Sequence, residues 1–177
     1  MRNKSGQPDS SSGIILLCNK QLSRVPDDIP ESPIYLDFSS NHIKNPDFPK
    51  DHSTLISLHL NENPLSKLDN IRFNNLRSLS LDFCNLNSMK QIPQLPNLIS
   101  LSLVGNCLSS FENFHIFPNL TKIDLRGNSV SFTPIHTLAA ICSLRLSTIN
   151  GRSVTDKEFQ AAFSLSPIVG HALRKGR

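Results

Sequence analysis

The sequence predicts an α/β solenoid, a coil of short repeats built on one parallel β-sheet of about seven short strands. Three observations lead to this fold class. The pattern L-x-x-L-x-L-x-x-N-x-L returns along the chain, the last apolar position of the pattern recurs every 21 or 22 residues, and the segments between the copies are short and rich in proline. In chain order, that last position falls on Leu22, Ile43, Leu65, Leu86, Leu108 and Val130.

The copies of the pattern differ in quality along the chain. Four copies, starting at Leu55, Leu76, Leu98 and Leu120, match it closely. A copy upstream of them has Pro33 in its first position, and a degenerate first copy precedes that one. The degenerate first copy and the expected terminal copy are carried by Ile15, Leu17, Lys20 and Leu22, and by Ile141, Leu144, Leu146 and Ile149.

Each copy is expected to contain one short strand whose side chains alternate between two faces. Leu101 and Leu103 should therefore point into the core while Ser100 and Ser102 point outward. A single strand cannot bury its leucines, so neighbouring repeats must stack into one continuous core. Phenylalanines and leucines then recur every three residues between the copies, which favours 3₁₀ or irregular segments on the convex side.

The asparagine position lies where the chain leaves each strand and its backbone groups lose the ladder. An inward amide offers two donors and an acceptor, so it can bridge consecutive coils there. In one copy a small thiol replaces the amide. The expected column is Asn41, Asn63, Cys84, Asn106 and Asn128.

This spacing resembles the short intracellular class of leucine-rich repeats. That class includes a regulatory subunit of protein phosphatase one, the spliceosomal A-prime protein and an axonemal dynein light chain. The resemblance covers residues 14 to about 160 and implies a right-handed leucine-rich-repeat coil with a curved sheet. It also implies a protein that holds another macromolecule on the concave sheet face.

The two ends of the chain are expected to differ from the repeats. Residues 1–12 are polar and predict a disordered tail, and the repeat domain is expected over 13–154. Residues 149–155 are similar to the C-terminal capping motif of the class. Thr155 and Glu158 form a capping box, and Phe159, Ala162 and Phe163 form an apolar stripe. Residues 155–177 are therefore predicted to be a capping helix followed by a basic tail.

Charge distribution and cysteine content indicate where the protein is located and which kinds of partner it can bind. Residues 1–144 balance their charges, and residues 145–177 carry the whole net charge of +4, so RNA contact is expected only through that tail. No apolar run approaches a membrane span or a secretory signal, and the four cysteines are scattered. The expected location is cytoplasmic, with cytoskeletal or ciliary sites favoured and the nucleus as the alternative.

The sequence contains no pattern that predicts catalysis. HExxH, GxSxG, GxGxxG and P-loop motifs are absent, and no Cys/His cluster has zinc spacing. We therefore expect a protein that is not an enzyme, with no metal, no cofactor and no small-molecule substrate.

The outward-facing positions of the sheet are the expected binding surface. Serines fill its middle and leave room for close approach, whereas charged and aromatic side chains lie toward its ends. The ordinary reading is a solvated face. The candidate partner-binding residues are Tyr35, Asp37, His59, Glu62, Asp82, Phe83, Lys122, Asp124, Arg126 and Arg145.

The leading functional hypothesis is a non-catalytic scaffold or adaptor in a larger assembly, cytoskeletal or axonemal, with a helical guest on the sheet face. The alternative is a ribonucleoprotein adaptor of the spliceosomal A-prime type, although the face has few aromatic side chains on which bases stack. A phosphatase regulatory subunit is the third hypothesis. It ranks last because members of the class with that role have many more repeats than this chain.

Overall fold

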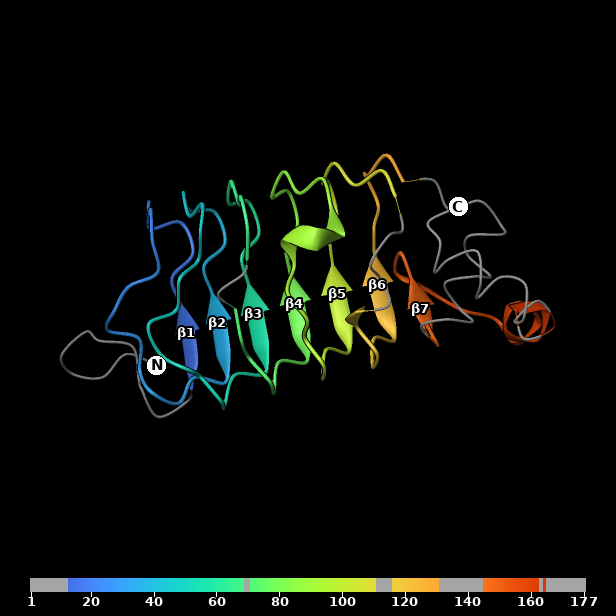
Figure 1. The fold of residues 1–177 in the computed structure, drawn as a ribbon, viewed down its shortest axis with the longest axis horizontal. Coiled ribbons are helices and arrows are strands. Elements are labelled where there is room, and N and C mark those ends of the chain that lie inside the picture. Colours follow the sequence, from blue (N-terminus) through green and yellow to red (C-terminus); the bar gives the residue numbers. More distant parts are fainter. Residues whose placement is uncertain (1–12, 69–70, 111–115, 131–144, 163, 165–177) are drawn as a thin grey trace.

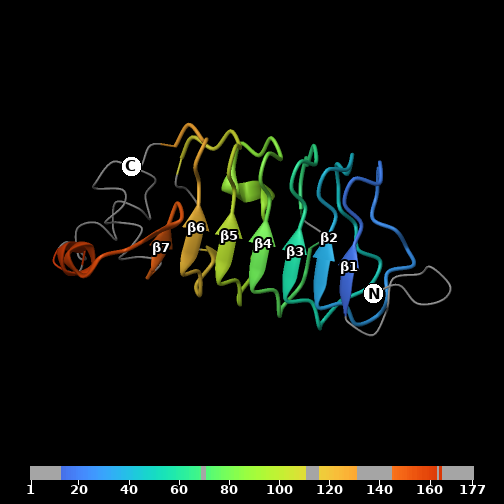
Figure 2. The same ribbon diagram turned by 180° about the vertical axis from the view of Figure 1, so that it is seen from behind.

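The computed structural model describes residues 13–68, 71–110, 116–130, 145–162 and 164. In these parts the chain winds as a solenoid whose strands lie side by side in chain order (Figure 1), and the view from behind shows the same row (Figure 2). No helix among the described residues has the length and apolar character needed to span a membrane. The strands are β1 (Ile14–Leu16), β2 (Tyr35–Asp37), β3 (Ser57–His59), β4 (Ser78–Ser80), β5 (Ser100–Ser102), β6 (Lys122–Asp124), β7 (Thr148–Ile149) and β8 (Arg152–Ser153).

One sheet contains all eight strands in the order β1 to β8. The pairs from β1–β2 to β6–β7 are parallel, and β7–β8 is antiparallel. From β1 to β6, each residue pairs with the residue 21 or 22 positions later in the next strand, as Leu79 does with Leu101. The predicted α/β solenoid is confirmed.

The core lies directly behind the sheet because the middle residue of each repeat strand points inward. Leu36, Leu58 and Leu79 in these positions are buried, as are Leu101 and Ile123. The convex segments close the other side of the core with short turns, and the 3₁₀ helix η2 (Met89–Gln91) is one of them. The alternation of inward and outward residues that the sequence predicts for these strands is therefore confirmed.

The predicted asparagine column is present and joins consecutive coils. The Asn106 amide donates to the carbonyls of Leu81 (2.8 Å) and Leu103 (2.9 Å), and its Oδ1 accepts from the backbone amides of Cys84 and Leu86 (3.0 Å each). Backbone groups that have left the sheet thus keep partners in the interior. Asn41, Asn63 and Asn128 make equivalent bonds.

Cys84 occupies the thiol position of this column as expected. Its Sγ is 3.2 Å from the Leu60 carbonyl oxygen, to which the thiol donates. Burial is the main cause that raises the pKa of Cys84 to about 11, so the group is a neutral thiol. A protonated thiol supplies one donor where the amide supplies two, which is enough to bridge to the preceding coil.

A second row of polar bridges, which the sequence reasoning missed, runs along the exposed turns before the strands. Asn75, Asn97 and Asn119 donate from Nδ2 to carbonyls one coil earlier, at distances of 2.7 to 2.8 Å. The Thr54 hydroxyl does the same toward Pro33 at 2.7 Å. The signal was available, because an asparagine directly precedes a buried leucine at the repeat spacing.

The last coil corrects the expected register. Ile149 pairs with Ile123, and Thr148 pairs with Lys122, so this step is longer than the preceding ones. A strand was expected around Leu144 and Leu146. This prediction is wrong for Leu146, which is buried but lies before β7. Leu144 lies outside the described residues. Arg145, expected among the outward-facing residues of the sheet, is exposed on the segment before β7.

A hairpin turn fixes this register. Asn150 and Gly151 have φ values of 53° and 76°, the left-handed conformation that a two-residue turn of type I′ requires at both positions. The turn joins β7 to β8, and Asn150 Oδ1 accepts the Leu125 backbone amide at 2.8 Å. The Asn-Gly pair therefore places Ile149, and not the expected Leu144 five residues earlier, beside Ile123.

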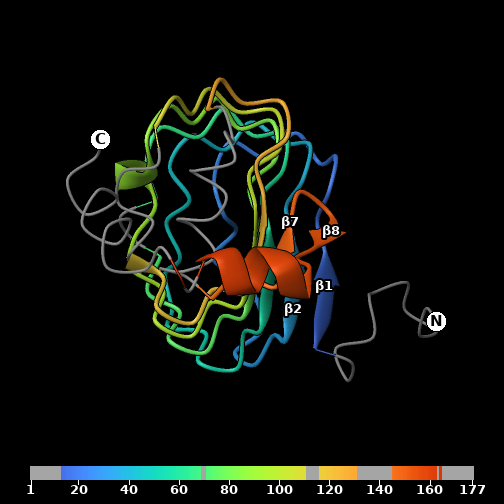
Figure 3. The same cartoon turned by 90° about the vertical axis from the view of Figure 1, so that its right-hand side faces the viewer.

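The segment after β8 starts a helix over residues 156–162, which lies across the end of the coil in Figure 3. Thr155 Oγ1 accepts the Glu158 amide (3.3 Å), and Glu158 Oε2 accepts the Thr155 amide (2.9 Å), so both bonds of the expected capping box are present. The bond from Arg152, then those from Thr155, lower the pKa of Glu158 to about 2. Ala162 is buried and Phe159 packs on the core, whereas Phe163 and residues 165–177 lie outside the described residues, as does the tail 1–12.

His52 is an unexpected member of the interior. Its side chain is buried between Phe48 and Phe73, with ring centroids 6.2 and 6.1 Å away, and neither ring nitrogen has a hydrogen-bond partner. Burial lowers the pKa of the imidazole. The charge of Asp51 opposes that shift only in part, while the charge of Lys50 adds to it.

We expect the free energy of unfolding to fall as the pH drops below about 6.5, the pKa of an unfolded histidine, because only the unfolded chain then protonates His52 readily. The loss should reach at most about 1.4 kcal/mol per pH unit for this one group. Denaturant titrations between pH 5 and 8 measure it. His52→Leu should flatten the slope, whereas the exposed His42→Gln should keep it; an unchanged slope in His52→Leu would contradict the assignment.

Candidate partner-binding surface

The outward side chains of β1 to β7, together with the residues that follow each strand, form the surface that we call the sheet face. The register places Tyr35 beside Ser57 and Asp37 beside His59. Further along, it places Ser102 beside Asp124. The outward residues that strand alternation predicts therefore line up between neighbouring strands from β1 to β6.

An aromatic pair occupies the sheet face at β2 and β3. The Tyr35 and His59 rings have centroids 4.9 Å apart, and the Ser57 hydroxyl lies 3.2 Å from His59 Nε2. Burial first, and then the charge of Asp37, raises the pKa of the Tyr35 hydroxyl. The phenol therefore stays neutral and keeps its proton available for donation, beside a carboxylate that accepts the Ser39 amide.

The middle of the sheet face is a hydrogen-bonded polar ladder. Ser80 Oγ donates to Asn61 Oδ1 (2.7 Å), and Ser102 Oγ donates to Asp82 Oδ1 (2.6 Å). Asp82 Oδ1 also accepts the Val104 amide at 2.8 Å. The Ser80 and Ser102 hydroxyls are thus already engaged between neighbouring coils, which fixes the floor of this surface.

Basic side chains lie at the β6 end. Arg126 forms a two-pronged ion pair with Asp124, with Nη2 2.6 Å and Nε 2.9 Å from the carboxylate oxygens, and that bond raises the pKa of Arg126. Lys122 is exposed on the same strand. Because Asp124 is neutralised by Arg126, the excess charge at this end is positive.

A row of residues with positive φ runs along one edge of the sheet face, and we call it the rim. It contains one residue per coil, directly before the asparagine column: Ser40, Glu62, Phe83, Gly105 and Gly127. Each amide from Ser40 to Gly105 donates to a carbonyl of the next coil at 2.8 to 2.9 Å, so the row is continuous. A residue other than glycine in this conformation costs about 1–2 kcal/mol. Phe83, whose ring is exposed, therefore occupies a position that its backbone conformation disfavours.

Parallel coils of 21 or 22 residues, a buried leucine on the inner side of each strand from β2 to β5 and an interior asparagine column together decide the fold. This is a leucine-rich-repeat solenoid of the short-repeat class. Solenoids of this kind typically bind other molecules on an extended open surface and carry no catalytic site.

Comparison with known proteins gives structural likenesses only. No family model and no curated protein matches the chain. A chain of the Drosophila melanogaster SNF/U2A′ complex is 25% identical, with a TM-score of 0.46 over 76% of this chain and 69% of that one. A chain of the Chaetomium Mex67:Mtr2 subunits is 22% identical, with a TM-score of 0.41 over 51% of this chain and 64% of that one.

The leucine-rich-repeat solenoid brings most of the predicted binding residues onto its sheet face or rim. Arg145 is the exception, because the long last coil removes it from the sheet. Their role in binding stays a prediction. The residues on the face or rim are Tyr35, Asp37, His59, Glu62, Asp82, Phe83, Lys122, Asp124 and Arg126.

Apolar side chains at the first coils extend this surface. Leu16 is 60% exposed on β1, and Ile34 and Ile56 are exposed directly before β2 and β3. Neighbouring exposed apolar groups usually mark a contact. Strand alternation places Ile14 and Leu16 outward, but Ile34 and Ile56 stand directly after the first position of their copies, Pro33 and Leu55, where the pattern assigns no direction.

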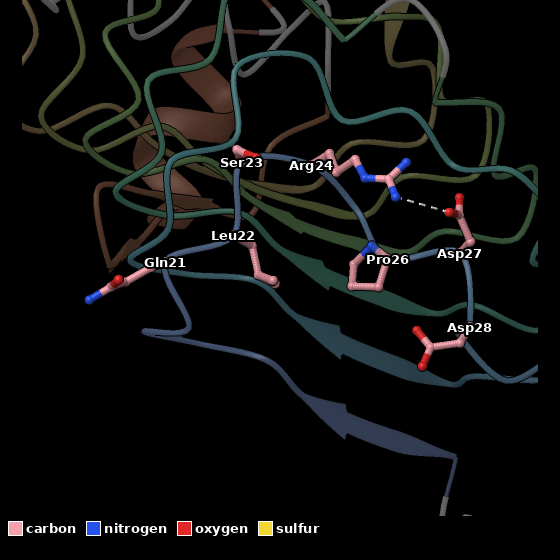
Figure 4. Close-up of a pocket in the computed structure, with 7 residues that line it drawn as sticks. All are labelled: Gln21, Leu22, Ser23, Arg24, Pro26, Asp27 and Asp28. Carbon is pink, nitrogen blue, oxygen red and sulfur yellow. Dashed lines mark ion pairs between the residues drawn. The ribbon is translucent and has the colours of Figure 1, made fainter.

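The hollow at the loop after β1 does not form a built site (Figure 4). There Arg24 and Asp27 form a 3.3 Å ion pair whose two side chains are mostly exposed. Exposed pairs of this kind contribute little. Among the described residues, no group of three His, Cys, Asp or Glu side chains is arranged to hold a metal ion.

Proposed function

We propose that this protein is a non-catalytic scaffold that holds a helical segment of a protein partner along the sheet face. The observation that carries the proposal is the arrangement of that face. It has a fixed polar floor at Ser80 and Ser102, an aromatic pair at Tyr35 and His59, and exposed apolar groups around Leu16.

The dimensions favour a helix. Seven parallel strands spaced about 4.8 Å apart span roughly 29 Å, which is the length of a helix of about 19 residues. Small serine side chains at Ser78, Ser80, Ser100 and Ser102 allow a helix to approach the sheet closely.

The charges favour one orientation of that helix. Asp37, Glu62 and Asp82 lie on coils 2 to 4, and none of the described lysines or arginines forms an ion pair with them. Coil 6 carries Lys122 and Arg126. A guest that is apolar and basic toward β1 and acidic toward β6 matches both ends, because complementary potentials set the register of an interface.

A bulky substitution in the middle of the sheet face tests whether the partner binds there. Ser102→Arg places a long side chain above the polar floor, and we expect it to reduce capture of the native partner at least tenfold in a pull-down with the full chain as bait. Tyr35→Ala should also weaken binding about tenfold, since aromatic anchors carry much of the energy at interfaces.

Two control measurements accompany this test. Ser66→Arg adds the same side chain at an exposed position outside the sheet and should capture the partner as the unmodified chain does. Thermal unfolding must show that Ser102→Arg remains folded, because Ser102 donates to Asp82. A partner that binds folded Ser102→Arg normally would show that the sheet face is not the site.

For the assembly, we propose a cytoskeletal or axonemal complex in the cytoplasm first and a ribonucleoprotein complex in the nucleus second; a phosphatase complex is third. The described face offers Tyr35, His59 and the rim residue Phe83 as rings, and its serine floor gives bases little to stack on, which supports a protein partner over direct RNA contact. Mass spectrometry of proteins captured by the unmodified bait and lost with Ser102→Arg separates these assemblies.

A further inference from the structure

The rim contains a hollow whose two walls differ in chemistry. The Glu62 carboxylate is turned toward the preceding coil, where Oε2 accepts the Ser40 hydroxyl at 2.8 Å. The Phe83 ring is turned toward the following coil, where it lies over Gly105. The two side chains part, and the space between the coils is lined by both, with His42, Pro64 and Asn85 around it.

Gly105 makes this placement of the ring possible. A Cβ atom at Gly105 would overlap the Phe83 ring, and the φ of Gly105 is +66°, so both space and backbone favour glycine there. The ring is 57% exposed although it rests on the backbone of the next coil. Phe83 is thus held in place and still presents aromatic surface to a partner.

We infer that this hollow takes an arginine side chain of the partner protein. The inference rests on the proposed function, since the arginine belongs to the guest on the sheet face. Glu62 supplies a negative charge without an ion pair among the described residues, and the Phe83 ring supplies an electron-rich face. A cation within about 6 Å of a ring centroid is attracted by that face.

Arginine fits these walls better than the other candidates. Its planar guanidinium stacks on a ring while its N–H groups donate to a carboxylate, whereas lysine offers a compact, strongly hydrated charge. An anion would be repelled by Glu62 and by Asp82, which lies on the neighbouring coil and whose backbone oxygen accepts the Glu62 amide at 2.8 Å. The charge of the hollow therefore agrees with the acidic half of the sheet face.

The test uses three small probes with the full chain: N-acetyl-arginine amide, N-acetyl-lysine amide and N-acetyl-citrulline amide. Citrulline keeps the shape of arginine and removes its charge. Titrations followed by amide NMR should show shifts at Ser40, Glu62, Phe83 and Asn85 with the arginine probe, at least about threefold weaker binding of the lysine probe, and no saturable shifts with citrulline.

Two variants test whether the two walls of the hollow bind the arginine probe. Glu62→Gln and Phe83→Leu should each weaken the arginine probe at least about threefold, while Glu31→Gln, at an exposed carboxylate far from the rim in sequence, should leave it unchanged. Both wall positions are exposed, so thermal midpoints close to that of the unmodified chain are expected. Equal shifts with citrulline, or wall variants that bind as the unmodified chain does, would overturn the inference. The proposed function would stand in either case if Ser102→Arg still blocks the native partner.

Discussion

Replacing Asn106 with alanine is expected to lower the free energy of unfolding by about 3 kcal/mol or more. The side chain serves four buried backbone groups, the amides of Cys84 and Leu86 and the carbonyls of Leu81 and Leu103. Each buried group left without a partner costs about 1–3 kcal/mol, although a water molecule that enters the new space will recover part of this. Chemical denaturation of the two proteins gives the difference directly.

Asn97→Ala is the matched control for that measurement. Asn97 is also an asparagine that joins neighbouring coils, through a 2.8 Å bond from Nδ2 to the Asn74 carbonyl, but this bond is exposed. Water can replace its partner, so the expected loss is about 1 kcal/mol or less. Similar losses in the two variants would mean that the interior column has no special role in joining the coils.

Ending the chain after Ser147 is expected to cost more than about 3 kcal/mol and to promote aggregation. The truncation removes Ile149 and Ala162, which are buried, and uncovers Ile123 on the last complete coil. Deleting one large buried aliphatic side chain already costs about 2–5 kcal/mol, and terminal repeats without a polar cover lose solubility. Thermal unfolding and size-exclusion chromatography measure the two effects.

A chain that starts at Gly13 is the control for this truncation, since it keeps every described strand, and its midpoint should be nearly unchanged. A chain that ends after Ser147 and remains monomeric with an unaltered midpoint would show that the hairpin and helix are not a cover for the core.

Much of the fold could be predicted because the repeat constrains each residue several times over. Leu58, Leu79 and Leu101 are inward because they recur at one position of a strand with a period of two, and the asparagine column follows from backbone groups that need partners. The last coil could not be placed by the same reasoning. The repeat pattern put Leu144 in the inward strand position of that coil, whereas the Asn150–Gly151 turn puts Ile149 there.

The candidate surface was predicted in outline but not in its contacts. Strand alternation shows that Ser102 and Asp82 point outward, yet the bond between their side chains depends on the register of two coils. Phe83 could be predicted on the open surface, but its ring could not be placed over Gly105, because only the three-dimensional stacking brings the two together. His52 lies in an irregular convex segment without a period, so nothing in the pattern marked it as buried.

The single row of strands gives the molecule a direction along which it frays. Each strand packs chiefly on its immediate neighbours, and within the described residues the first coil has only one, with Ile15, Leu17 and Leu22 incompletely buried. In such linear arrays the end units open most readily, so amide hydrogens of β1 should exchange before those of β4. A guest helix that spans the row would hold neighbouring coils together, and it would slow amide hydrogen exchange most at β1, where the coil opens most readily.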